Sequence, residues 1–166
     1  FIFMVIGKTT EMLSMYEVGD VFEDVTGPLG RPSQFSDGVW TVIGGGVGLA
    51  IAFPITRQLV KTGHEVHAIM GARTKGLLLL EDQFREILPD DHVHITTDDG
   101  SYGEKGVVTA PLERLLKAKK TDHVFCVGPV PMMKFSALTA SKYNTPITAS
   151  LNPIMVDGTG MCGCCR

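Results

Sequence analysis

The chain has no long apolar run and no run of basic residues. Its 166 residues carry 15 Lys and Arg against 18 Asp and Glu, a formal net charge of −3. The apolar stretch at residues 1–6 is far shorter than the roughly 20 residues that a membrane-spanning helix needs, and it has no positively charged leader. Aromatic residues make up only 7% of the chain and are not interleaved with Lys and Arg. We therefore expect a globular protein with no membrane span, no signal peptide and no nucleic-acid partner.

Cysteine is scarce and unevenly placed. Of the four cysteines, Cys126 lies in an apolar run that is typical of a buried strand, while the other three lie within residues 162–165. This distribution does not suit a disulfide framework in a chain of this size. Clustered thiols without a secretory signal favour the cytoplasm.

The last ten residues combine those three cysteines with a carboxylate and several glycines. Asp157, Cys162 and Cys165 have the spacing D-x4-C-x2-C, which is similar to the C-x4-C-x2-C run of plant-type [2Fe-2S] ferredoxins with the first thiolate replaced by a carboxylate. The glycines at 158, 160 and 163 would let the backbone bend around a cluster. The spacing therefore predicts Asp157, Cys162 and Cys165 as cluster ligands.

Other interpretations of this loop are a structural zinc half-site, a redox dithiol and a flexible tail. Zinc would need a second pair of ligands, and Cys126 is the only other cysteine. A [2Fe-2S] cluster takes four ligands, of which these residues supply three. The fourth would come from sequence outside this chain or from a partner.

The chain divides into three segments by pattern. Residues 1–36 contain short apolar and β-branched runs at 1–6 and 21–25, bounded by glycine-containing turns, which predict an all-β element. Residues 37–152 alternate apolar strands with amphipathic stretches, and residues 153–166 contain the cysteine loop. Both ends resemble cuts through a larger protein.

The middle segment is predicted to be an α/β domain with a five-stranded parallel sheet and helices on both faces, a Rossmann-like nucleotide-binding fold. Strands are expected at residues 39–43, 65–70, 93–97, 123–127 and 147–151, and helices at 49–62, 75–88, 107–119 and 130–143.

A glycine-rich turn links the first of these strands to the first helix. It consists of Gly44, Gly45, Gly46, Val47 and Gly48. Such a turn lets backbone amides approach a pyrophosphate while the helix offers its positive N-terminal end. The third glycine comes one residue early for G-x-G-x-x-G, and by itself the turn fits a strand-to-helix connection without a ligand equally well. Its position at the end of the first strand of a parallel sheet favours a phosphate site.

Three further segments are expected at the same carboxyl edge of the sheet, where ligands of parallel sheets bind. The Arg after the second strand is expected either to bind an adenosine 2′-phosphate or to be a solvated charge in a loop. The sequence therefore does not decide between NADH and NADPH as the cofactor. The predicted binding residues of these segments are Gly71, Ala72, Arg73, Thr97, Asp98, Gly128, Pro129 and Met132.

These segments occur in the order found in the ferredoxin-NADP reductase superfamily, which the whole chain resembles. It looks most like the small (alpha) subunit of NADH-dependent ferredoxin:NADP oxidoreductases, also called sulfide dehydrogenase. A related family is the electron-transfer subunit of class B dihydroorotate dehydrogenases. An aspartate at position 157 resembles the former family, because the latter normally has a cysteine there.

The resemblance implies that residues 1–36 are the C-terminal remnant of an FAD-binding β-barrel and residues 37–152 an NAD(P)-binding domain, with residues 153–166 opening a [2Fe-2S] segment. The implied flavin-contacting residues are Gly7, Thr9, Thr10, Gly27, Pro28 and Gly30. Residues 44–48 would hold the nicotinamide pyrophosphate, and Gly128 with Pro129 would lie beside the nicotinamide.

The resemblance also implies the activity. Electrons would pass between NAD(P)H, FAD and the [2Fe-2S] cluster to or from a larger, glutamate-synthase-like beta subunit in a heterodimer, with ferredoxin as a further candidate partner. Hydride transfer demands no acid or base side chain, so no catalytic residue is expected. The alternatives are the dihydroorotate dehydrogenase subunit and a non-catalytic nucleotide-binding domain with a zinc tail.

Overall fold

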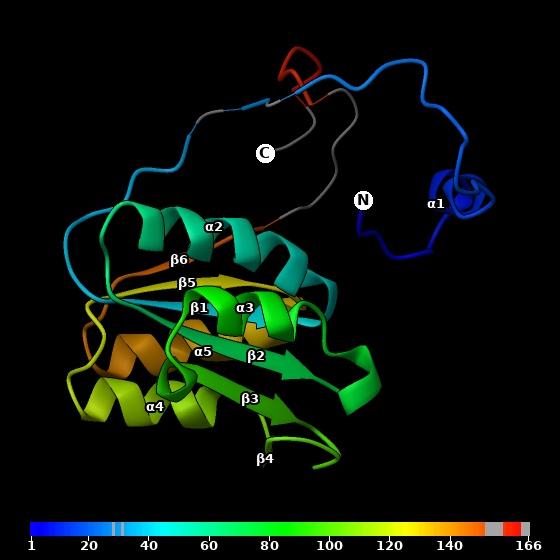
Figure 1. The fold of residues 1–166 in the computed structure, drawn as a ribbon. Helices are drawn as coiled ribbons and strands as arrows, with labels where there is room; N and C mark the ends of the chain where they lie inside the picture. Colours follow the sequence, from blue (N-terminus) through cyan, green and yellow to red (C-terminus); the bar gives the residue numbers. More distant parts are fainter. Residues whose placement is uncertain (28, 31, 152–157, 164–166) are drawn as a thin grey trace. The chain divides into compact units, whose positions relative to one another are not determined.

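The computed structural model describes residues 1–27, 29–30, 32–151 and 158–163. The chain forms two units, one made of residues 1–34 and 152–166, the other of residues 35–151. The larger unit contains the sheet (Figure 1).

The larger unit is built on a parallel sheet with strand order β4-β3-β2-β1-β5-β6. Its strands are β1 (Trp40–Gly45), β2 (Val66–Ala72), β3 (Val93–Thr97), β4 (Glu104–Lys105), β5 (His123–Val127) and β6 (Ile147–Ala149). Five of these correspond to the predicted strands. The sixth, β4, is two polar residues long, too short for a periodic pattern to be seen in the sequence.

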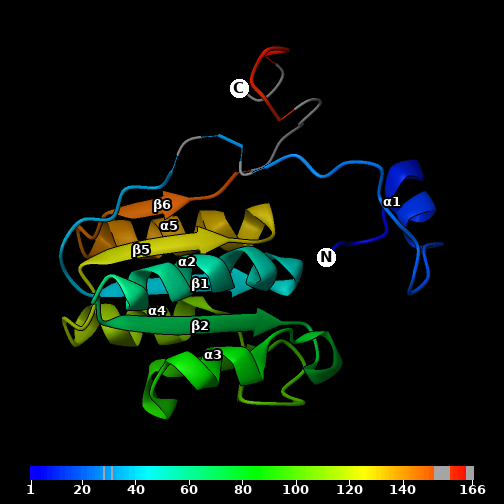
Figure 2. The same ribbon diagram turned by 45° about the horizontal axis from the view of Figure 1, so that its top comes forward.

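Helices cover both faces of the sheet, as Figure 2 shows. The helices α2 (Leu49–Lys61) and α3 (Glu81–Ile87) pack on one face, and α4 (Thr109–Lys117) and α5 (Val130–Lys142) on the other. Neighbouring strand residues point to opposite faces, so Val42 joins the α2 side of the core and Ile43 the α4 side. The parallel α/β fold predicted from the sequence is confirmed.

The helix predicted at residues 75–88 is interrupted. The structure has a 3-10 turn, η2 (Lys75–Leu77), followed by α3 from Glu81. Leu80 has a φ of 61°, a left-handed conformation in which an α-helix cannot continue. The apolar side chains Leu78 and Leu79 instead pack against the core, which is why the apolar pattern runs through the break.

The prediction of strands at residues 1–6 and 21–25 is wrong. The described part of residues 1–36 contains no strand, and its regular element is the short helix α1 (Lys8–Leu13). Aromatic contacts accompany it: the Phe22 ring lies 5.0 Å from Tyr16 and 5.4 Å from Phe1 between centroids. A β-branched pattern favours extended backbone, but a strand exists only where another backbone supplies hydrogen bonds.

Within the described residues, no helix has the length and apolar character needed to cross a membrane.

Candidate functional site

The glycine-rich turn lies where β1 ends and α2 begins. Gly44 and Gly45 close the strand, and a 3-10 turn, η1 (Gly46–Gly48), leads directly into α2. Gly46 has a φ of 55°, and an added Cβ there would meet no atom within 4 Å. The backbone at Gly46 therefore faces open space at the N-terminal end of a 13-residue helix, where unpaired amides favour an anion.

The loop after β5 forms a second wall against this turn. A Cβ on Gly45 would lie 2.5 Å from Met132 Sδ and 3.1 Å from Pro129 Cδ. A Cβ on Gly48 would lie 2.5 Å from the Val127 carbonyl oxygen. Because the obstacle at Gly48 is backbone, only glycine fits at that position. The fold thus brings the turn of residues 44–48 together with Pro129 and Met132.

Gly128, in the loop after β5, also packs closely against the glycine turn. Its φ is 152°, and a Cβ would lie 2.8 Å from Met132 Cε and 3.0 Å from the Gly45 carbonyl oxygen. The predicted grouping of the glycine turn with Gly128, Pro129 and Met132 is thus present as direct packing across the carboxyl ends of β1 and β5.

The segment after β2 lies beside the same edge. Gly71 is paired in register with Gly45, and a Cβ on it would lie 2.5 Å from Val108 Cγ1, so this glycine also lets the chain before α4 pack closely. Arg73 is exposed. The carbonyl oxygens of Ala72 and Arg73 accept the backbone N–H groups of Asp98 and Asp99, at 3.1 and 3.3 Å.

Thr97 and Asp98 differ in what they offer to a ligand. Thr97 is fully buried, and its hydroxyl donates to the Tyr102 carbonyl oxygen at 2.6 Å and accepts the Tyr102 N–H at 3.1 Å. Asp98 is exposed. The Thr97 side chain therefore holds the loop after β3, while Asp98 is accessible to a ligand.

Sequence reasoning did not single out Tyr102, which anchors this loop to α3. Its hydroxyl donates to Glu81 Oε1 at 2.7 Å, a bond that raises the pKa of Tyr102, and Lys75 Nζ lies 4.6 Å from its ring centroid. In the sequence, the only indication of this role was an aromatic residue inside a polar, glycine-containing loop. The contact with Glu81 spans 21 positions and is not visible in local pattern.

The residues predicted to contact flavin lie in the smaller unit. The Thr10 hydroxyl accepts the backbone N–H groups of Ile6 and Gly7 at 3.0 and 3.1 Å and donates to the Gly7 carbonyl oxygen at 2.9 Å. Thr10 thus caps α1. Thr9, Gly27 and Gly30 are not buried, and Pro28 lies outside the described residues.

The predicted cluster ligands are only partly within the described residues. Asp157 and Cys165 lie outside them, and Cys162 is exposed. Gly158, Gly160 and Gly163 have φ values of 71°, 88° and 63°, so the described part of this loop has the left-handed turns that the glycine spacing predicted.

Cys126 is a core residue rather than a site residue. It is fully buried in β5 between Ile43 and Ala149 in register, and burial raises the pKa of its thiol to about 11. The thiol therefore stays protonated at neutral pH.

A family model described as "Oxidoreductase NAD-binding domain" matches residues 42–137. The chain is 49% identical over 163 residues to a dihydroorotate dehydrogenase B (NAD(+)) electron transfer subunit homolog from Thermotoga maritima, covering 98% of this chain and 57% of that protein. It is 33% identical to the dihydroorotate dehydrogenase B (NAD(+)) electron transfer subunit of Geobacillus kaustophilus, covering 96% and 60% of the two chains.

Among solved structures, the chain is similar to a chain in the structure of an NADH-dependent reduced ferredoxin-NADP oxidoreductase studied for flavin-based electron bifurcation. The TM-score is 0.84 at 47% identity, covering 98% of this chain and 58% of that one. A C-terminal domain of a Pyrococcus furiosus hydrogenase shares the fold at a TM-score of 0.59 and 20% identity, over 75% of this chain and all of that domain. The chain thus spans 57% of the Thermotoga maritima protein, 60% of the Geobacillus kaustophilus protein and 58% of the oxidoreductase chain.

Proposed function

This chain belongs to the ferredoxin-NADP reductase superfamily and contains its oxidoreductase NAD-binding domain, and from that premise we propose that it is part of an electron-transfer subunit that exchanges electrons with NAD(P)H. The observation that carries the proposal is the packing of the glycine turn against Gly128 and Met132 at the carboxyl edge of the sheet. This edge is where dinucleotides bind in open parallel sheets.

The residues at this edge fit a nicotinamide dinucleotide. The open backbone at Gly46 and the N-terminal end of α2 would hold the pyrophosphate through amide donors and the helix dipole. Gly128, Pro129 and Met132 would lie beside the nicotinamide ring. When bound, the nicotinamide supplies a hydride. The residues of this edge would orient the nicotinamide ring and exclude water from it.

The position of Arg73 bears on cofactor preference. It is exposed directly after β2, where the residue nearest the adenosine ribose distinguishes the two cofactors in this fold. No acidic residue is present at positions 71–73. We propose that Arg73 lies near the ribose and tolerates a 2′-phosphate there.

The proposed function also includes a flavin, an iron-sulfur cluster and a partner subunit. Its support is the loop of residues 157–165 with its spacing of Asp and Cys, together with two relatives of 49% and 47% identity whose names describe electron transfer with NAD(+) and an NADH-dependent ferredoxin-NADP oxidoreductase. We propose FAD, a [2Fe-2S] cluster held by Asp157, Cys162 and Cys165, and a larger partner subunit in the cytoplasm.

A second candidate is the electron-transfer subunit of a class B dihydroorotate dehydrogenase. The names of the relatives from Thermotoga maritima and Geobacillus kaustophilus favour it. The residue that distinguishes the two families is Asp157, because the dihydroorotate dehydrogenase subunit normally has a cysteine there. An oxygen ligand in place of a thiolate should also change the reduction potential of the cluster.

The proposal is tested by anaerobic reduction of the full-length protein with NADH and with NADPH, following flavin absorbance and the EPR spectrum. Gly46→Glu places a carboxylate in the open space at the turn and should slow nucleotide-dependent flavin reduction at least tenfold. Gly46→Asn is the matched control, because Asn tolerates the left-handed backbone and adds no charge. Equal reduction rates in the two variants would contradict the nucleotide site.

The cluster is tested in the same samples. A [2Fe-2S] EPR signal should appear on reduction and shift in Asp157→Cys, which exchanges the carboxylate for a thiolate. A protein that holds zinc and no iron would overturn the cluster assignment while leaving the nucleotide site intact.

A further inference from the structure

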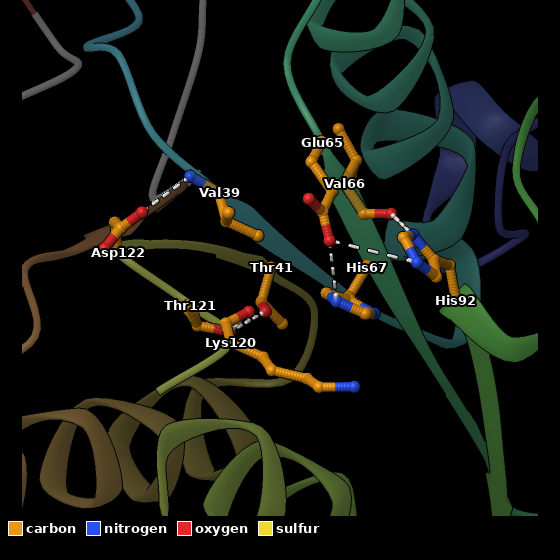
Figure 3. Close-up of polar contacts among 9 residues, drawn as sticks. All are labelled: Val39, Thr41, Glu65, Val66, His67, His92, Lys120, Thr121 and Asp122. Atoms are coloured by element: carbon orange, nitrogen blue, oxygen red, sulfur yellow. Dashed lines mark hydrogen bonds and ion pairs between the residues drawn. The ribbon is translucent and has the colours of Figure 1, made fainter. Parts of the chain in front are cut away.

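A group of nitrogen and oxygen donors lies at the amino-terminal edge of the sheet, at the opposite ends of the strands from the glycine turn. Glu65 directly precedes β2, His67 is its second residue, and His92 ends the 3-10 turn η3 (Asp90–His92) that leads into β3. One ligand atom from each lies within 4.8 Å of the other two. Figure 3 shows the three side chains directed toward one another.

The backbone fixes the two elements that supply these donors. The Glu65 carbonyl oxygen accepts the Trp40 N–H at 2.9 Å, so the start of β2 is tied to β1. Ala68 pairs with Val93 in the parallel register, which places His67 beside His92. Residues 65 and 67 are two apart, so their side chains share one side of the chain.

His92 presents a lone pair to this group. Its Nδ1 lies 3.0 Å from the Val66 carbonyl oxygen, and because a carbonyl can only accept, Nδ1 must carry the proton. In the neutral ring Nε2 then has a lone pair, and it lies 3.9 Å from Glu65 Oε1. A ring that donates through one nitrogen to a backbone carbonyl and offers the other is the usual arrangement of a metal-binding histidine.

His67 is buried and has no hydrogen-bond partner. The residue is 3% exposed, and neither ring nitrogen has a hydrogen-bond partner. Its Nε2 lies 3.8 Å from Glu65 Oε1, and its ring lies 4.1 Å from that of His92 between centroids. An unpaired buried imidazole is costly, and a cation between these donors would give Nε2 a partner.

We propose that Glu65, His67 and His92 bind one divalent metal ion of the zinc class. Two imidazole nitrogens and one carboxylate oxygen are a donor set that zinc accepts in a four-coordinate site with one open position. Donors that each lie about 2.1 Å from zinc are roughly 3.4 Å apart, so the three must close in slightly. Glu65, whose side chain is 56% exposed, is free to make that adjustment.

The surroundings leave room for an outward-facing fourth position. A hollow of about 170 Å³ lined in part by His64, Glu65 and His92 adjoins the group and gives room for water. Near His67, the negative charge of Asp91 favours a cation and the positive charge of Lys120 opposes one.

The ion would join the start of β2 to the turn before β3, far along the strands from the proposed nucleotide edge. Its role would be to stabilise the strand pair rather than to carry electrons. The proposal does not depend on the proposed function, and either can fail without the other.

The test uses Zn²⁺ with the full-length protein in which Cys162, Cys164 and Cys165 are replaced by Ser, so that the cysteine loop cannot compete. Isothermal titration at pH 7.5 should show one zinc site, and the zinc absorption edge should show nitrogen and oxygen neighbours only. Glu65→Gln and His92→Gln should each weaken binding at least roughly tenfold. Zinc should also raise the unfolding temperature of the parent protein.

His123→Gln is the matched control, because His123 lies on β5, two strands away in the sheet, and it should leave zinc affinity unchanged. Glu65 is exposed and Gln has the same shape, so this variant should fold even if replacing the buried His67 does not succeed. Absence of a zinc site, or equal affinity in Glu65→Gln, His92→Gln and the parent, would overturn the proposal.

Discussion

At the residue scale, the glycines of the proposed nucleotide site have two different roles. Gly46 needs its left-handed backbone, with a φ of 55°, and has open space around it. Gly48 has an ordinary helical φ of −58° and is glycine only because the Val127 carbonyl lies so close. The first role concerns the ligand, and the second concerns packing.

Gly48→Ala should therefore destabilise the fold through contact alone. The new Cβ would lie 2.5 Å from the Val127 carbonyl oxygen and 3.0 Å from Gly128 Cα, and backbone atoms cannot rotate away. We expect a loss of about 1–3 kcal/mol in the free energy of unfolding, measured by urea denaturation, together with weaker nucleotide binding. Gly76→Ala, where a Cβ meets no atom within 4 Å, is the control. Equal loss in both variants would contradict this explanation.

At the element scale, the loop of residues 98–106 depends on one buried hydroxyl. Thr97 ends β3 and bonds both the N–H and the carbonyl oxygen of Tyr102, while Tyr102 reaches Glu81 on α3. The loop is thus tied to the sheet and to a helix at the carboxyl edge.

Thr97→Val keeps the shape of the side chain and removes both hydrogen bonds. Because the Tyr102 backbone groups lose a buried partner, we expect a loss of about 1–3 kcal/mol in the free energy of unfolding. Hydrogen exchange should become faster at the amides of Tyr102 and Gly106. Thr148→Val, an exposed position on β6, is the control, and unchanged exchange in Thr97→Val would show that the loop is held by other contacts.

At the scale of the whole molecule, the buried histidines make stability depend on pH. Burial, followed by the charges of His92, His94 and Lys120, lowers the pKa of His67 from 6.5 to about 4, and burial followed by Arg114 lowers that of His94. The folded state thus keeps these rings neutral in a pH range where the unfolded chain binds protons.

The metal-free protein, with EDTA present, should therefore lose stability as the pH falls from 6.5 toward 4. Above pH 6.5 neither state protonates His67, and below about 4 both do, so the loss is confined to this window. For His67 it amounts to about 3 kcal/mol. Urea denaturation across the window should show a shallower slope in His67→Gln than in the parent or in His123→Gln. The same slope in all three proteins would exclude His67 as the cause.

Local pattern determined much of this molecule by itself. The alternation of apolar runs predicted five of the six strands and the parallel fold, because buried strands and amphipathic helices have different periods. The glycine turn, Gly128 and Pro129 were predicted to lie together because parallel strands bring their carboxyl ends to one edge, and the family resemblance added Met132. Residues 1–6 and 21–25 were misassigned because a β-type pattern does not supply a pairing partner.

Only the tertiary structure decided which residues meet across the sheet. The close approach of Gly48 to Val127 and the bond from Tyr102 to Glu81 join residues that lie 79 and 21 positions apart. The histidines show this most clearly: in the sequence His67 and His92 are 25 positions apart with no metal-binding spacing. The β2–β3 register makes them neighbours, because parallel pairing depends on the packing of both faces of the sheet and not on any local pattern.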